Sequence, residues 1–200
     1  TIDGIWLDAE LYFASDAKKN YYKNYKGNKC CFCDNCFSSF FLLQGIEGEN
    51  FPPAAPKDRY RWLKEHNQFE AYRKFLSVEV ETLAEEFAAG VRRDKDDLLI
   101  GLYPSVFIEE DYSDWFLLAI ARGLGSQEQP VLIFETTTYG YYGRKGHTRI
   151  PDNPEAVYTR AGVDGKFVAG YLLRRFSPHE IEENLYYALR KGSGYWMFRL

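Results

Sequence analysis

The chain has 200 residues, which is enough for one sizeable hydrophobic core. Its net charge of −4 gives no general reason to expect nucleic acid or an anionic membrane as a partner, and no apolar run approaches the length of a membrane-spanning helix. Aromatic residues make up 18% of the chain, mainly 16 Tyr and 15 Phe. Because Tyr combines a flat apolar face with a hydroxyl, this composition suits sugar-binding proteins, although it also suits rigid cores.

The opening segment, residues 2–10, is predicted to be a strand that ends in acidic residues. Side chains alternate along a strand, so one face carries Ile5, Leu7 and Ala9 and the other carries Trp6, Asp8 and Glu10. In parallel α/β barrels the carboxyl ends of the strands hold the catalytic groups. We therefore take Asp8 and Glu10 as candidate catalytic residues. The alternative is that these acids only mark a turn or cap the next helix.

A stretch rich in Lys and Tyr follows, from Lys18 to Lys29. Basic residues interleaved with aromatic ones can bind nucleic acid through phosphate contacts and base stacking. The rest of the chain is acidic, so a solvated loop is the preferred interpretation and no nucleic-acid partner is expected.

All four cysteines lie within seven residues, at Cys30, Cys31, Cys33 and Cys36. Short Cys intervals of this kind are typical of metal ligands, and thiolates in tetrahedral geometry suit Zn²⁺. We expect a structural zinc site, with at least three of the four sulfurs on one ion, and no organic cofactor. Disulfides or inert thiols are the alternatives, although the adjacent pair Cys30 and Cys31 could form a bridge only with strain.

The remaining segments alternate between helical and strand patterns. Helices are predicted to begin near Phe37, to fill most of residues 57–93 after a Gly- and Pro-rich loop, and to cover 114–123, a stretch from Asn153 and the segment 177–191. Further strands are predicted at 98–103, 130–135, 167–173 and 195–199. The strand 130–135 also ends in acid, because Glu135 follows Val131 and Ile133 on one face. Glu135 is therefore a third candidate catalytic residue.

Apart from the first interval, which holds the cysteines, the strands recur about every 30 residues, as βα units require. Right-handed crossovers would make the strands parallel neighbours in chain order. We therefore expect an α/β fold in which residues 1–200 form the C-terminal part, about strands four to eight, of a (β/α)₈ TIM barrel catalytic domain, with a Cys-rich insertion at 12–56. The alternative is a flavodoxin-like sheet, but no Gly-rich phosphate loop follows the first strand.

The run Asp3-Gly4-Ile5-Trp6-Leu7-Asp8-Ala9-Glu10 resembles the fourth-strand signature of family 18 chitinases, Asp-Gly-x-Asp-x-Asp-x-Glu. In this chain Trp6 stands where that signature has its middle Asp. It also looks like the fourth strand of retaining α-galactosidase-type barrels, where the Asp at the strand end is the nucleophile and a carboxylic acid after strand six is the acid/base. That resemblance implies these roles for Asp8 and Glu135.

The spacing Cys31-x-Cys33-x-x-Cys36 is similar to the zinc knuckle of family 42 β-galactosidases. In that family a fourth Cys lies upstream of the fourth strand, a part that this chain lacks; the family's strand-four Asn-Glu pair is also absent here. The resemblance covers the whole chain as a barrel plan, whereas its specific motifs cover about residues 2–40.

These observations predict a glycoside hydrolase that cleaves a glycosidic bond with a carboxylate pair drawn from Asp8, Glu10 and Glu135. Stacking faces for the carbohydrate substrate would come from Tyr103, Tyr139, Tyr141 and Trp196. The missing N-terminal part of the barrel, or another chain, is expected to complete the fold.

Two alternatives remain. One is a barrel without catalysis that serves as a carbohydrate-binding or assembly module. The other is a metal-dependent hydrolase using Asp8, Glu10 and a histidine, which is disfavoured because, of His66, His147 and His179, only His147 falls near a predicted strand end.

Overall fold

The computed structural model describes residues 2–8, 30–46, 55–103, 115–135, 138–139, 146, 150–172 and 175–198. The chain divides into two compact units. The sheet unit comprises Thr1–Phe13 and Glu81–Leu200, and the cysteine unit comprises Ala14–Val80. The Cys-rich stretch expected over residues 12–56 lies almost entirely within the cysteine unit.

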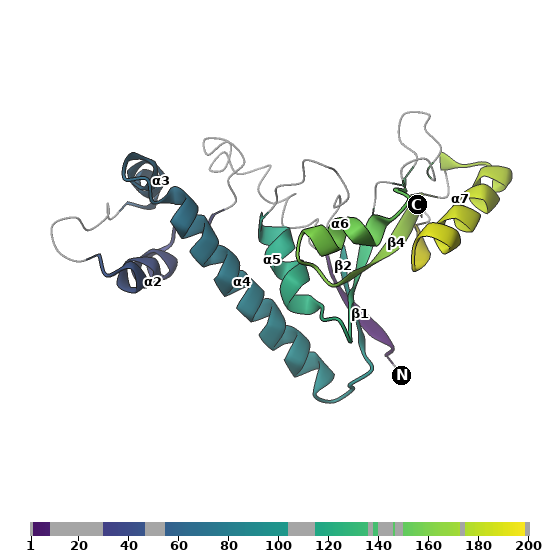
Figure 1. Cartoon of the computed structure of the whole chain (residues 1–200), viewed down its shortest axis with the longest axis horizontal. Coiled ribbons are helices and arrows are strands. Elements are labelled where there is room, and N and C mark those ends of the chain that lie inside the picture. Colours follow the sequence, from purple (N-terminus) through teal and green to yellow (C-terminus); the bar gives the residue numbers. More distant parts are fainter. Residues whose placement is uncertain are drawn as a thin grey trace. The chain divides into compact units, whose positions relative to one another are not determined.

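The sheet unit is built on five parallel strands in the sequential order β1-β2-β3-β4-β5. Figure 1 shows this sheet, with β1, β2 and β4 labelled. The strands are β1 (Gly4–Asp8), β2 (Leu99–Tyr103), β3 (Val131–Glu135), β4 (Gly165–Leu172) and β5 (Gly194–Phe198). The predicted strands and their parallel order in the chain are thus confirmed. A flavodoxin-like sheet would instead run 2-1-3-4-5, so that alternative is wrong.

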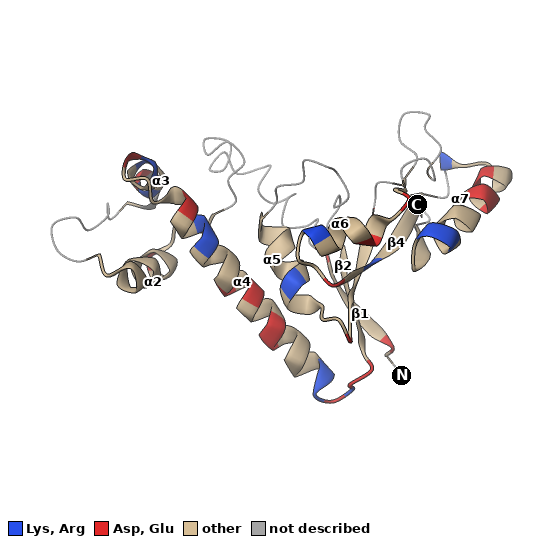
Figure 2. Ribbon diagram, in the orientation of Figure 1, with Lys and Arg blue, Asp and Glu red and all other residues tan. Residues whose placement is uncertain are grey.

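Helices alternate with these strands: α5 (Trp115–Leu124), α6 (Pro154–Arg160) and α7 (Pro178–Lys191), together with the part of α4 (Phe69–Arg92) from Glu81 onward. The start of α7 matches the prediction: Ser177 and Glu180 form a reciprocal capping box, with Pro178 in the first turn. Acidic residues lie in the first half of α7 and basic residues in its last turn, which complements the helix dipole (Figure 2).

The core of the sheet unit lies on one face of the sheet. That face contributes Ile100, Leu102, Val131, Ile133, Phe167, Ala169 and Tyr171. Each helix of this unit that the structure describes adds buried residues to the same cluster: Ala84, Ala88, Leu117, Ala121, Leu124, Tyr158 and Ala188. Ile5 and Leu7 also pack against it, as the alternation in β1 predicts. The helices therefore cover one face, which we call the helix face, and the other is the second face.

The cysteine unit holds α2 (Asp34–Gln44), α3 (Pro56–Glu65) and the first half of α4. The long helical region predicted over about 57–93 consists of two helices, α3 and α4; between them Asn67 adopts a left-handed conformation with φ 57°. The core of this unit is aromatic, with Phe32, Phe37 and Phe40 packed around Tyr72. Among the described residues, no helix is long and apolar enough to cross a membrane.

Candidate functional site

The second face of the sheet carries a group of aromatic side chains toward the carboxyl ends of the strands. Its members, which we call the aromatic layer, are Trp6, Tyr103, Phe134, Tyr139 and Trp196. Trp196 is central, because its ring centroid lies 5.4 Å from that of Tyr103, 5.6 Å from Tyr139 and 6.2 Å from Phe134. Trp6 extends the layer to β1, with its centroid 5.5 Å from Phe134.

Two glycines make room for this layer. A Cβ at Gly101 would collide with the ring of Phe134, and a Cβ at Gly170 would lie 2.7 Å from the indole of Trp196. The ring of Phe134 therefore lies directly over Gly101, and the indole of Trp196 lies directly over Gly170. A side chain at either glycine would occupy the space of the ring. The hydroxyls of Tyr103 and Tyr139 are 2.9 Å apart and hydrogen-bonded. Three of the four predicted sugar-stacking residues thus meet in one place; the fourth, Tyr141, lies outside the described residues.

Asp8 ends β1 on the same face as Trp6. Its partner in the parallel ladder is Tyr103, so the carboxylate lies at the edge of the aromatic layer. Asp8 is exposed, and the neighbouring Trp6 is 66% exposed. The second predicted carboxylate of this strand, Glu10, lies outside the described residues.

Glu135 ends β3 on the helix face, opposite to Asp8. Its side chain is 0% exposed, and the hydroxyl of Tyr158 donates a hydrogen bond to Glu135 Oε1 over 3.2 Å. Burial, the negative charge of Glu135 and this hydrogen bond raise the pKa of Tyr158 well above its usual value. Asp8 and Glu135, two of the three candidates for the carboxylate pair, therefore lie on opposite faces of the sheet.

The physical reason is strand parity, and the sequence held the signal. In β1 the apolar residues alternate with Asp8, whereas in β3 Val131 and Ile133 share the face of Glu135. When both apolar sets pack under helices, the two carboxylates must point to opposite sides of the sheet.

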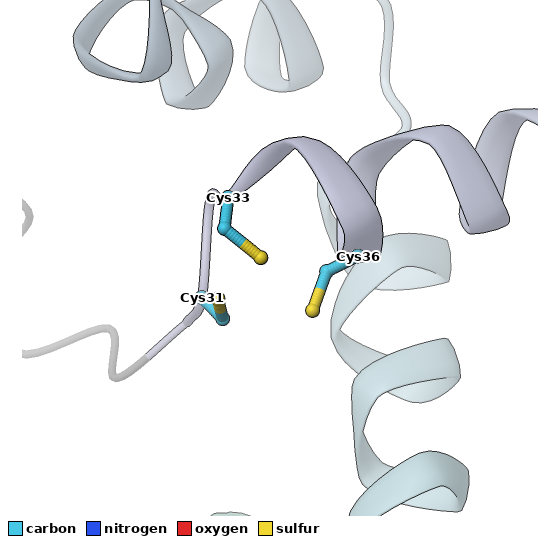
Figure 3. Close-up of side chains that lie close together, drawn as sticks. All are labelled: Cys31, Cys33 and Cys36. Carbon is cyan, nitrogen blue, oxygen red and sulfur yellow. The ribbon is translucent and has the colours of Figure 1, made fainter.

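The cysteine unit brings three sulfurs together. Ligand atoms of Cys31, Cys33 and Cys36 all lie within 4.8 Å of one another, and they form the one such cluster of His, Cys, Asp or Glu among the described residues. Cys33 caps the N-terminus of α2 and Cys36 lies in its first turn, so both side chains leave the helix toward Cys31 on the preceding loop (Figure 3). A tetrahedral zinc site with bonds of about 2.3 Å separates its sulfurs by about 3.8 Å, so a small contraction would fit the ion. The cluster could therefore hold a metal ion such as zinc.

Two buried groups fix the backbone of this turn. Arg59, 5% exposed, donates to the carbonyl of Phe32 over 2.6 Å and forms an ion pair with Asp34. The hydroxyl of Tyr72 donates to the carbonyl of Cys31. These bonds hold the chain on both sides of Cys33, in the arrangement that brings the three sulfurs together.

The thiols differ in their environments. A hydrogen bond from the backbone N–H of Cys36 lowers the pKa of Cys33, as expected at a helix N-terminus. Burial, followed by hydrogen bonding to Cys33, raises the pKa of Cys36 to about 12, and burial also raises the pKa of Cys31. A metal ion would have to displace protons from these two thiols, so its binding must weaken at low pH.

Cys30, the fourth predicted ligand, is not part of the cluster. It is 2% exposed, and burial raises its pKa to about 12, so it is a thiol of the core. None of the histidines joins a cluster with Asp8: the ring of His66 stacks on Trp62 at 4.0 Å, His179 is exposed on α7, and His147 lies outside the described residues.

The fold and this site define the class of the protein, an α/β protein with a five-stranded parallel sheet and a cysteine cluster able to bind a metal. No family model, no curated protein and no solved structure matches the chain.

Proposed function

We propose that the chain is part of a glycoside hydrolase-like (β/α)₈ barrel that binds a carbohydrate on the second face of its sheet and cleaves it with Asp8 and a second carboxylate. The observation that carries this proposal is the aromatic layer beside Asp8, on the face opposite the helices. Flat aromatic faces stack on the C–H faces of sugar rings, and an exposed carboxylate at a strand end can reach a glycosidic bond.

The arrangement of the sheet supports a barrel. Sequential parallel order with right-handed crossovers puts all helices on one side, whereas doubly wound sheets have helices on both. In a barrel the second face is the interior, and the carboxyl ends of the strands form the mouth of the active site. Further strands, from a longer chain or a partner, would close the barrel and complete the substrate site.

In this scheme Asp8 is the nucleophile or charge stabiliser. Glu10, two residues further along and therefore expected on the same face, is the preferred acid/base. Glu135 has a different role here, because its carboxylate is buried under the helices where no sugar reaches it.

A barrel that binds carbohydrate without cleaving it is the second candidate. One observation favours it: among the described strand residues, Asp8 is the single carboxylate on the second face.

The test measures binding and cleavage separately on a panel of oligosaccharides and polysaccharides. Quenching of tryptophan fluorescence reports binding near Trp196, and release of reducing ends reports cleavage. Asp8→Asn should abolish cleavage and keep binding, whereas Trp196→Ala should weaken both. Asp97→Asn, an exposed residue just before the amino end of β2, is the matched control and should change neither. Binding that is intact, with no cleavage of any substrate by the wild type, would favour the binding module; no binding of any carbohydrate would exclude both candidates.

We further propose that Cys31, Cys33 and Cys36 hold a structural Zn²⁺ in the cysteine unit. When bound, zinc would tie the loop before α2 to the first turn of that helix. Metal analysis of protein purified without chelator should find about one zinc per chain. The Cys33→Ser variant should bind none.

A further inference from the structure

We infer that the zinc site of the cysteine unit keeps one coordination position open to solvent and takes an exogenous thiolate there. This inference rests on the proposed zinc site and adds the ligand class that the site accepts. It starts from an imbalance: tetrahedral structural zinc has four protein ligands, and the structure brings three sulfurs together.

The described part of the cysteine unit offers no fourth ligand. The remaining cysteine, Cys30, is buried apart from the cluster. The nearby carboxylates have basic partners: Asp34 is paired with Arg59, and Glu70 with Arg73 at 2.6 Å. His66 has its Nδ1 2.8 Å from the carbonyl of Trp62 and its ring stacked on the same residue.

The cluster is also accessible. Cys31 and Cys33 are exposed, and Cys36 is half-buried. Two of the three cysteines are therefore exposed, and a ligand from solution can approach an ion held between the three sulfurs.

In this proposal three protein ligands suffice, because hydrogen bonds from Arg59 and Tyr72 hold the turn on both sides of Cys33. Small zinc knuckles fold only when four ligands wrap the metal. In this unit Arg59 and Tyr72 fix the carbonyls of Phe32 and Cys31. Helix α2 packs Phe37, Phe40 and Phe41 into the aromatic core. These hydrogen bonds and the packing of α2 thus position the three cysteines, a task that a fourth ligand shares in small zinc knuckles.

The open position should favour a thiolate. Zn²⁺ bound to three thiolates accepts a fourth soft donor readily, as in Cys₄ sites. Binding is a simple ligand exchange: the incoming thiol releases its proton to solvent and its sulfur replaces a water, with no change of oxidation state.

The test uses Co²⁺ in place of zinc, because sulfur-to-cobalt charge-transfer absorption grows with the number of bound thiolates. The 200-residue chain is loaded with Co²⁺ and then titrated with 2-mercaptoethanol, with ethylene glycol as the control without sulfur. Three bound thiolates should become four, so the charge-transfer absorbance should rise by about one third with the thiol and stay unchanged with the glycol.

Variants and a size measurement exclude Cys30 and a second copy of the chain as sources of the fourth ligand. Cys30→Ala and Cys30→Ser should reproduce both spectra of the wild type, and the cobalt-loaded chain should elute as a monomer before thiol is added. Three results would overturn the inference: no response to 2-mercaptoethanol, a charge-transfer band that weakens in both Cys30 variants, or a cobalt-dependent dimer. Failure of the metal site itself gives a different result, because no charge-transfer band then appears before thiol is added.

Discussion

The hydroxyl of Tyr158 on α6 donates a hydrogen bond to the carboxylate of Glu135 at the end of β3, across 3.2 Å, with both side chains fully buried. A buried carboxylate is costly unless it is hydrogen-bonded. The bond therefore joins the carboxyl end of a central strand to the helix that covers it, and Glu135 becomes a residue of the framework.

Removing this carboxylate should destabilise the sheet unit. Glu135→Ala leaves the Tyr158 hydroxyl buried without its acceptor, and the free energy of unfolding should fall by about 2–3 kcal/mol. Glu135→Gln keeps an acceptor oxygen and should cost less. Urea unfolding followed by circular dichroism measures both. Equal losses in the two variants would contradict a role through this hydrogen bond.

The same pair predicts a loss of stability in alkali. The pKa of Tyr158 is raised in the folded state, so its contribution to stability is fully present below the unfolded pKa of about 10. Above that pH the unfolded chain releases the proton while the folded chain retains it, and stability falls. Burial raises the pKa of Tyr171 in the same direction. Tyr158→Phe should therefore flatten the decline between about pH 10 and 11.5 without abolishing it. Thermal unfolding across this range is the measurement, and an unchanged slope in Tyr158→Phe would exclude this residue as a cause.

Gly170 should be intolerant of any side chain. Its Cβ would lie 2.7 Å from the indole of Trp196 and closer still to the carbonyl of Glu135, which is backbone and cannot move aside. Gly170→Ala should lower the free energy of unfolding by about 1–3 kcal/mol and disturb the fluorescence of Trp196. Gly194→Ala is the matched control, because a Cβ at this position of the same sheet has no heavy atom within 4 Å. If Gly170→Ala left the free energy of unfolding unchanged, the aromatic layer would be loosely packed.

Arg59 should affect zinc affinity without being a ligand of the ion. Its guanidinium joins the carbonyl of Phe32 and the carboxylate of Asp34, so Arg59→Ala should loosen the turn and weaken zinc binding by about 10–100-fold. Arg59→Lys keeps the charge but cannot bond both partners as the guanidinium does, so its zinc affinity should lie between those of the wild type and Arg59→Ala. Competition with a chromophoric chelator measures the affinity. Arg73→Ala, which removes a half-exposed cation from the same unit, is the control and should have little effect.

Local patterns predicted the strands and most helix boundaries well. Apolar runs bounded by turn residues located all five strands to within about two residues. The Ser177-Pro178-x-Glu180 motif located the start of α7, because a capping box satisfies its hydrogen bonds within four residues. The break at Asn67 was missed, since a left-handed residue inside a helical pattern leaves no periodic signal.

The convergence of Cys31, Cys33 and Cys36 was also predictable from spacing alone, because cysteines that lie within six residues of one another stay close in space when the chain turns. The separation of Cys30 was not. Cys30 is next to Cys31 in the chain, and only the tertiary packing of the unit buries its side chain in the core.

The sequence by itself thus determined the parallel βα order, the alternating faces of each strand and the metal-ligand spacing, because all three depend on residues that are close in the chain. Only the tertiary structure decided how the faces of different strands align. The ladder registers placed Asp8 with Tyr103, and packing against α6 turned Glu135 to the other side. Strand pleating fixes the side of each residue relative to its own neighbours, whereas the choice of which side meets the helices is made by burial across the whole sheet.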